Sequence, residues 1–491
     1  MNTRHSILSA MGLFLRRSLA IPVVLLLAGC QLVPDGEVSV GTIPRPSELS
    51  REDAIGAREH PRVVASYGGV YKDSKAEKAI ARVVGRLVAA SDDPSQSYRI
   101  TILNSPTVNA FALPGGYLYI TRGLLALAND SSEVAAVLAH EMGHVTARHA
   151  IARQQRAEAA ALVNRVVTSV VEDPSAAKNA VKSSQISLAR FSQAQELHAD
   201  TIGVKTLAKA GFDPYASARF LDSMGRYAAF VTAGGQTGGP EDFLASHPST
   251  PERVVLARKA AREYGAPGIG DRDRDAYLKN VSGMLYGDDP LEGFVRGRSF
   301  LHKALGIAFT VPRGYILENS PEAVMASNTD GAALRFDGAD LGRDQSLEGY
   351  VSSGWINGLV QDSLRKITVN GLPAVTASAI ADGWSFRIAI IRVGQSGFRF
   401  IAATRRPSAG FTQSFEETVK SFRQLTPTEQ ARLNPLRIRL AKTQAGDTPT
   451  ILARKMTGIE ASRRLELFAI LNGIKTTDRL PAGTLVKVVV E

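Results

Sequence analysis

The chain has one cysteine among 491 residues, so it cannot form an internal disulfide. Beyond its N-terminal leader it has no apolar stretch long enough to span a bilayer. It also lacks a stripe of Arg and Lys with interleaved aromatic residues, and we therefore expect no nucleic-acid partner despite a net charge of +11. We assign the basic excess to a surface that faces anionic envelope polymers or lipid headgroups.

What the chain does contain is the composition of a folded protein. Hydrophobic residues make up 44% and charged residues 21%, which is the balance of a globular chain and excludes a disordered one. The length exceeds what one ordinary core can organise, so we expect several domains.

The N-terminus has the pattern of an export signal. Three arginines and no acidic residue accompany the apolar run LAIPVVLLLAG, which ends at Cys30. The letters LAGC resemble a bacterial lipobox, which implies a signal peptide over residues 1–29 and a lipidated Cys30. The alternative is an ordinary secretory signal with an incidental cysteine. Gln31 stands where Asp would signal the inner membrane, so the resemblance implies a periplasmic protein anchored to the inner leaflet of the outer membrane.

Composition and periodicity divide the remainder of the chain. We predict a multidomain protein: a mainly α-helical α+β domain, a small α+β domain with an antiparallel sheet, and a C-terminal unit whose resemblance to a known module implies the order β-α-α-β. Helices are expected at 76–90, from Ser131 through His149, and at 192–210. The segments WSFRIAIIRV and GFRFIAATR, joined by Gly-Gln-Ser-Gly, are expected to form a hairpin. The predicted segments are a tether at 30–60, the first domain at 61–265, a linker at 266–297, the small domain at 298–425 and the last unit at 435–491.

The stretch LAHEMGHVTARHA, residues 138–150, contains the pattern H-E-x-x-H. Residues four apart lie on one face of a helix, so His140 and His144 can bind one metal ion together. Glu141 is offset toward an open coordination position, where it can act as general base for water that zinc activates. The short pattern also occurs by accident, so it requires a third ligand to be specific.

A second acidic pair lies downstream in QELHAD, residues 195–200. Glu196 and Asp200 are four apart and share a helix face. We predict Glu196 as the third metal ligand and Asp200 as the acceptor for the distal nitrogen of a zinc-binding His. The alternative is a surface helix with solvated acids.

Four motifs occur in order across residues 109–254: NAFALPGGYLYITRGLL, HEMGHVTARH, ELHAD followed by GFDP, and SHPSTPERV. Together they resemble the gluzincin zinc metallopeptidase family that includes HtpX, the CAAX prenyl peptidases and the periplasmic BepA and LoiP proteins. The resemblance implies a zincin-type endopeptidase with one Zn²⁺ held by His140, His144 and Glu196, and with Glu141 as base. His198 departs from the family pattern, which often has Glu there.

Further residues of these motifs have candidate roles. A strand formed by Asn109, Ala110, Phe111 and Ala112 either holds substrate as an added strand or is an ordinary core strand. On a continuous helix His149 points roughly 140° away from His144, so we expect a structural hydrogen-bonding role and not a ligand.

His247 lies in the fourth motif, in a Pro-rich loop. We predict that it returns to the zinc as a removable fourth ligand, or to the transition-state oxyanion. A helix-capping or loop-packing role is the alternative.

The C-terminal segments AGDTPTILARKM, LFAILNGIK and RLPAGTLVKVVV resemble a LysM module, which implies peptidoglycan binding. Two features depart from that pattern: the segment between Gly446 and Asn472 is longer than usual, and Thr450 stands where an aromatic residue is common. The alternative is a small packing or protein-interaction domain.

These patterns predict a zinc-dependent endopeptidase of the bacterial periplasm. The resemblance implies that it acts in quality control on misfolded or unassembled envelope proteins. The competing hypothesis is a chaperone or cell-wall-tethered adaptor whose zinc site is latent or structural. The intact Glu141 favours the peptidase, because nothing structural requires a carboxylate there. The sequence leaves the role of residues 298–425 open.

Overall fold

The computed structural model describes residues 46–170, 174–234, 243, 247–248, 250–342 and 344–491. The predicted signal peptide and the predicted lipidation at Cys30 lie outside the described residues. Helix α1 (Pro46–Ser66) begins inside the segment predicted as a tether. Among the helices of the described ranges, none combines the length and apolarity needed to cross a membrane.

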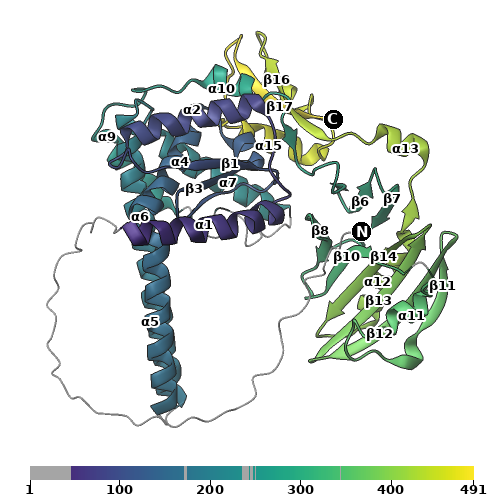
Figure 1. The fold of residues 1–491 in the computed structure, drawn as a ribbon. Coiled ribbons are helices and arrows are strands. Elements are labelled where there is room, and N and C mark those ends of the chain that lie inside the picture. The colour runs from purple at the N-terminus through teal and green to yellow at the C-terminus, as the bar shows by residue number, and fades with distance from the viewer. Residues whose placement is uncertain (1–45, 171–173, 235–242, 244–246, 249, 343) are drawn as a thin grey trace. The chain divides into compact units, whose positions relative to one another are not determined.

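One group of elements, called the site body below, surrounds the predicted metal ligands (Figure 1). It comprises α1, α2 (Ser74–Ala90), β1 (Arg99–Leu103), β2 (Ala110–Leu113), β3 (Tyr117–Thr121), α3 (Arg122–Leu127), α4 (Ser131–Thr146), α5 (His149–Val170), α6 (Pro174–Lys209), α7 (Ala216–Ala233), α9 (Pro251–Arg262), α10 (Arg274–Val281) and β4 (Leu285–Tyr286). Its C-terminal elements are β16 (Leu436–Lys442), α14 (Pro449–Ala453), η2 (Ala461–Arg463), α15 (Arg464–Leu471) and β17 (Leu485–Val490).

Strands β1, β2 and β3 form a small mixed sheet in the order β1-β3-β2. β1 pairs with β3 in parallel and β2 pairs with β3 antiparallel, so β2 lies at an edge of this sheet. The predicted turn at Pro-Gly-Gly separates β2 from β3, and both its glycines, Gly115 and Gly116, have positive φ. Added Cβ atoms there would meet backbone atoms of Asp53 and Ser97, so this turn requires glycine.

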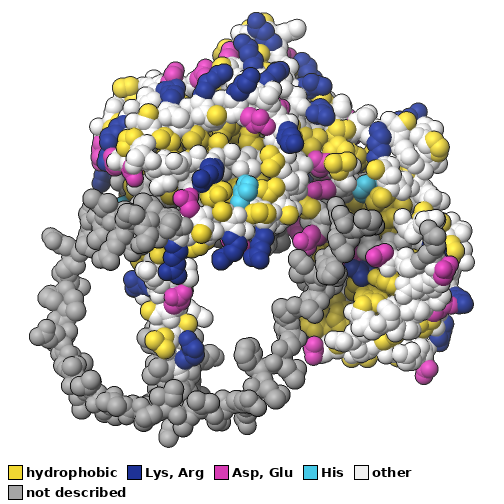
Figure 2. All heavy atoms as spheres, in the orientation of Figure 1, with side chains coloured by type: hydrophobic (Ala, Val, Ile, Leu, Met, Phe, Trp, Pro, Cys, Tyr) yellow, Lys and Arg dark blue, Asp and Glu magenta, His cyan; other side chains and the backbone are white. Residues whose placement is uncertain are grey.

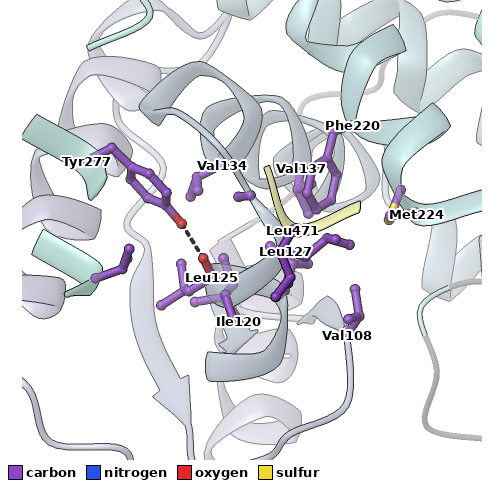
Figure 3. Packing of buried hydrophobic residues seen from close by; sticks show 14 of the residues in the cluster. Val108, Ile120, Leu125, Leu127, Val134, Val137, Phe220, Met224, Tyr277 and Leu471 are labelled. Atoms are coloured by element: carbon purple, nitrogen blue, oxygen red, sulfur yellow. Dashed lines mark hydrogen bonds between the residues drawn. The ribbon is translucent and has the colours of Figure 1, made fainter. Parts of the chain in front are cut away.

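The core of the site body contains side chains from segments far apart in the sequence, from α2 to β17. Figure 3 shows buried side chains of α3, α4, α7 and α10 in one cluster with Leu471 of α15. The hydroxyl of Tyr277, on α10, donates to the carbonyl of Leu125 at 2.6 Å. The segment predicted as a linker at 266–297 therefore contains a helix that packs in this core.

The helix predicted from Ser131 through His149 begins at Ser131, as predicted, but ends earlier. Its N-cap is Asp130, whose side chain accepts from the amide of Glu133. At the other end α4 stops at Thr146, Arg148 adopts a left-handed conformation with φ of 52°, and a new helix begins at His149. Arg148 is held in this corner by an ion pair with Glu52 of α1, a contact that local periodicity cannot reveal.

A second group of elements, called the sheet body below, has separate cores. Its main sheet is antiparallel with the order β11-β12-β13-β14-β10-β9-β8, and a smaller sheet has the order β15-β7-β6-β5. The elements are β5 (Phe294–Arg296), β6 (Ser299–His302), β7 (Ile307–Thr310), β8 (Ile316–Asn319), β9 (Val324–Ser327), β10 (Ala333–Ala339), α11 (Leu347–Val351), η1 (Gln361–Ser363), β11 (Arg365–Val369), β12 (Leu372–Ala381), β13 (Trp384–Val393), β14 (Ser396–Thr404), α12 (Ala409–Ser421), β15 (Arg423–Gln424) and, following them, α13 (Pro427–Arg432). The predicted antiparallel sheet and the β13–β14 hairpin are confirmed.

The C-terminal unit has the predicted β-α-α-β order, with β16 antiparallel to β17. Its side chains enter the core of the site body, and Lys487 of β17 is fully buried. The Lys487 ammonium donates to the carbonyls of Ala126, Leu127 and Ala128 at the C-terminal end of α3. Figure 2 shows Lys and Arg side chains gathered, with some acidic ones, over the surface where α2, α10 and these strands lie.

Candidate metal centre

Helices α4 and α6 bring the predicted ligands together. The two helices approach closely because each has a glycine at the contact. A Cβ on Gly143 of α4 would lie 3.2 Å from the carbonyl oxygen of Ala199, and one on Gly203 of α6 would lie 3.2 Å from the amide of His140. The close approach places Glu196 of α6 opposite the H-E-x-x-H face of α4.

Four side chains converge at this contact: His140, His144, Glu196 and His247, all buried. One ligand atom from each lies within 4.8 Å of the others. The Nε2 atoms of His140 and His144 are 3.0 Å apart, and each lies 3.3 Å from an oxygen of Glu196. The structure thus brings the three predicted ligands together.

The donor set fits one zinc ion. Ligand atoms at 2.0–2.1 Å from a tetrahedral Zn²⁺ are separated by about 3.3 Å, which matches these spacings. Among the described residues, Oε1 of Glu141 is buried and has no hydrogen-bond partner. Buried carboxylate oxygens without donors are costly unless a cation or substrate satisfies them. The His-His-Glu group is therefore suited to holding one Zn²⁺.

The electrostatics of the ligands favour metal binding with one exception. Burial would raise the pKa of Glu196, but hydrogen bonds from His140, His144 and His247 hold it well below its usual range. Burial lowers the pKa of His144 to about 3, so its ring is neutral. Burial also disfavours the charged form of His140, but Asp200 and Glu196 raise its pKa to about 9. Metal binding must displace that proton.

Asp200 lies behind the ligands, as predicted. Its Oδ1 is 2.9 Å from Nδ1 of His140, which directs the other ring nitrogen toward the ligand set. Arg253, on α9, holds both oxygens of Asp200 at 2.8 Å and also lies 3.3 Å from Glu196. We did not predict this role for Arg253, although it belongs to the motif SHPSTPERV. The signal in the sequence was the place of Arg253 in this motif. A buried arginine requires a carboxylate partner, and Asp200 is that partner.

His247 lies inside the ligand group. Its Nδ1 is 2.8 Å from Oε2 of Glu196 and 3.3 Å from Nε2 of His140. Its other ring nitrogen is 3.6 Å from Glu141. The amide of His247 donates to the carbonyl of Phe243, and the amide of Phe243 donates to the carbonyl of Val108, just before β2. These two hydrogen bonds connect His247 to the small sheet.

The predicted substrate strand includes most of β2. Ala110, Phe111 and Ala112 belong to this edge strand, and Asn109 precedes it. The amide of Thr121 donates to the carbonyl of Asn109, and the amide of Asn109 donates to the hydroxyl of Thr121. Phe111 stacks on Tyr119, with ring centroids 4.8 Å apart. The strand contacts α4, so its edge runs beside the helix that carries Glu141.

A mixed sheet with an edge strand, next to a helix bearing H-E-x-x-H and a second helix bearing Glu, defines a zinc metallopeptidase of the gluzincin type. Residues 74–261 match the model of Peptidase family M48. This part of the chain is thus a domain of the M48 metallopeptidase family.

The chain is similar to curated proteases from bacteria and mitochondria. A beta-barrel assembly-enhancing protease of Yersinia pestis is 29% identical over 54% of this chain and 54% of its own length. The corresponding Escherichia coli K12 protein is 29% identical over 39% of this chain and 40% of its own length. The mitochondrial metalloendopeptidase OMA1 of Schizosaccharomyces pombe is 33% identical over 36% of this chain and 50% of its own length. The chain thus spans about half the length of the curated relatives it matches.

Proposed function

We propose that this protein is a zinc-dependent endopeptidase of the bacterial cell envelope that hydrolyses misfolded or unassembled envelope proteins. The observation that carries the proposal is the convergence of His140, His144 and Glu196 beside the buried carboxylate of Glu141. The names of the two bacterial relatives, which join a protease to β-barrel assembly, support this class of substrate.

Zinc would polarise the peptide carbonyl and lower the pKa of water, so that a carboxylate completes the activation. Glu141 then accepts the proton of the attacking water and passes it to the leaving amine. Burial raises the pKa of Glu141, which makes this carboxylate a stronger base than an exposed one. Residues 109–112 hold the substrate as a strand added to the edge at β2.

His247 gates this site in the proposed mechanism. Its Nδ1, 2.8 Å from Glu196 and 3.3 Å from His140, would serve as a fourth ligand when zinc is bound, and substrate would have to displace it. After displacement the same ring can donate to the oxyanion. Under the gate, turnover of a peptide rises in His247→Ala, whereas under oxyanion assistance it falls. Unchanged turnover would rule out both roles.

The position of His247 also supports the second candidate function. A chaperone or cell-wall-tethered adaptor with a latent zinc site would keep His247 in place permanently. In either function the proposed location is the periplasm, with Cys30 lipidated and inserted in the inner leaflet of the outer membrane. The β-α-α-β unit is proposed to be LysM-like and to bind peptidoglycan.

The decisive experiment compares the chain lacking residues 1–30 with its Glu141→Gln variant. Bound zinc is quantified in both, and cleavage of casein is followed. We expect about one zinc in each and a rate about 10²–10⁴ lower in the variant. Zinc in both with cleavage in neither would overturn the peptidase proposal and favour the adaptor.

A further inference from the structure

The corner between α4 and α5 brings a histidine back to the zinc site. If the helix continued through residue 149, that side chain would point roughly 140° away from His144. The left-handed residue Arg148 interrupts the helix instead, and Nδ1 of His149 lies 2.9 Å from Nδ1 of His144. The ring of His149 is buried, and the side-chain amide of Gln195 donates to its backbone carbonyl.

A third imidazole extends this contact to the surface. Nε2 of His149 lies 3.2 Å from Nδ1 of His198, an exposed residue of α6. A neutral imidazole has one donor and one acceptor nitrogen, so neutral rings at these distances are arranged head to tail.

The direction of these hydrogen bonds follows from the ligand set. Nε2 of His144 faces His140 and Glu196 and would offer its lone pair to zinc there, so that Nδ1 of His144 would carry the proton when the metal is bound. It donates to Nδ1 of His149, whose Nε2 then carries a proton and donates to Nδ1 of His198. One tautomer of each ring satisfies the whole chain.

We propose that His149 is a positioning residue that fixes the tautomer and orientation of His144, and that His198 does the same for His149. The inference rests on the proposed zinc site. It makes the two histidine ligands unequal: His140 is backed by the carboxylate Asp200, which Arg253 holds in turn, whereas His144 is backed by an uncharged ring. A carboxylate raises the basicity of a ligand more than an imidazole does, so His144 is the weaker of the two ligands.

The test compares three substitutions of His149 in the purified full-length protein. Asn places an amide oxygen near the position of Nδ1 and retains the acceptor for His144. Gln places its amide group near Nε2 and loses that acceptor, and Phe loses both while keeping the ring volume. Zinc affinity is measured by competition with a chelator, and the geometry is read from the visible spectrum of the cobalt-loaded protein.

We expect His149→Phe and His149→Gln to weaken zinc binding by about 10–100-fold, with a changed cobalt spectrum. His149→Asn should retain nearly the wild-type affinity and spectrum. Equal affinities in all variants, or equal losses in Asn and Gln, would overturn the proposal.

His198→Phe provides a second variant at an exposed position, so it tests the proposal even if substitutions of His149 impair folding. We expect a smaller loss of zinc affinity and an unchanged unfolding temperature; no loss at all would remove His198 from the proposed arrangement. Failure of the wild type to bind zinc would defeat the proposed function and this inference together. If the wild type binds zinc and cleaves casein, but all His149 variants bind zinc as tightly as the wild type, only this inference is overturned.

Discussion

In the sheet body, the buried polar or charged side chains among the described residues are His302, Asp337, Thr404 and Thr418. All other such side chains of the described chain belong to the site body, including four histidines and the acids Glu133, Glu141, Glu196 and Asp200. Burying polar groups costs free energy that apolar packing does not incur. The sheet body therefore buries few polar groups, whereas the site body buries many, among them the four side chains of the metal site.

The two bodies also differ in what their contacts between distant segments hold. In the sheet body such contacts pair strands, as β10 with β14 and β7 with β15. In the site body they also hold buried charged groups, such as Arg253 with Asp200 and Lys487 with the end of α3. Substitutions should therefore affect zinc binding in one body and only stability in the other.

The largest effect is expected at the third ligand. Glu196→Ala should bind zinc much more weakly and show only background cleavage, because it removes the only anionic ligand of the group formed with His140, His144 and His247. Metal analysis and casein cleavage check both outcomes. Glu158→Ala, which removes an exposed acid of α5, is the control and should retain one zinc. Full zinc occupancy in Glu196→Ala would contradict the assigned ligand set.

A core substitution in the sheet body should destabilise that body alone. Phe400 is fully buried among Phe309 and Phe336, and Phe400→Ala should cost about 3–5 kcal/mol of unfolding free energy. Zinc content should stay at one per chain. The matched change Leu138→Ala, in α4, should lower stability and zinc affinity together. Loss of zinc in Phe400→Ala would show that zinc binding also depends on the core of the sheet body.

Lys487→Met tests whether the C-terminal unit stabilises the site body. The substitution leaves the three carbonyls at the end of α3 without their donor. We expect a loss of about 2–3 kcal/mol in urea unfolding. An unchanged midpoint would show that these hydrogen bonds contribute nothing net.

The same lysine predicts a dependence of stability on pH. Burial lowers the pKa of Lys487 from 10.5 to about 7, although Glu133 acts in the opposite direction. Between these values the unfolded chain binds a proton that the folded chain does not, so wild-type stability should rise with pH above 7. The slope is at most about 1.4 kcal/mol per pH unit. Lys487→Met should lack this rise between pH 7 and pH 9, and parallel curves would contradict the assignment.

The smallest effects are expected at two helix N-caps. Thr250 caps α9, which carries Arg253, and Ser408 caps α12 of the sheet body. Alanine at either position should cost about 1 kcal/mol of stability. Only Thr250→Ala should also weaken zinc binding, because it destabilises the start of α9, whose Arg253 donates to Asp200. Equal zinc affinities in the two variants would argue against a role of Arg253 at the site.

Local patterns predicted much of the structure. The H-E-x-x-H spacing placed His140, Glu141 and His144 on one helix, and the following acidic helix supplied Glu196. Alternation of apolar residues and short turns predicted the β13–β14 hairpin. These predictions succeeded because each depends on residues within a few positions of one another. The helix end predicted at His149 failed because a contact with Glu52 stabilises the turn at Arg148.

Local sequence patterns indicate which side chains can bind zinc, which carboxylate can act as base and where the β13–β14 hairpin forms. The groups around them are evident only after folding: Arg253 contacts Asp200, His149 contacts His144 and Lys487 contacts the end of α3. The reason is physical. Helical and strand periods act over a few residues, whereas the partner of a buried polar group is chosen by packing between segments far apart in the chain.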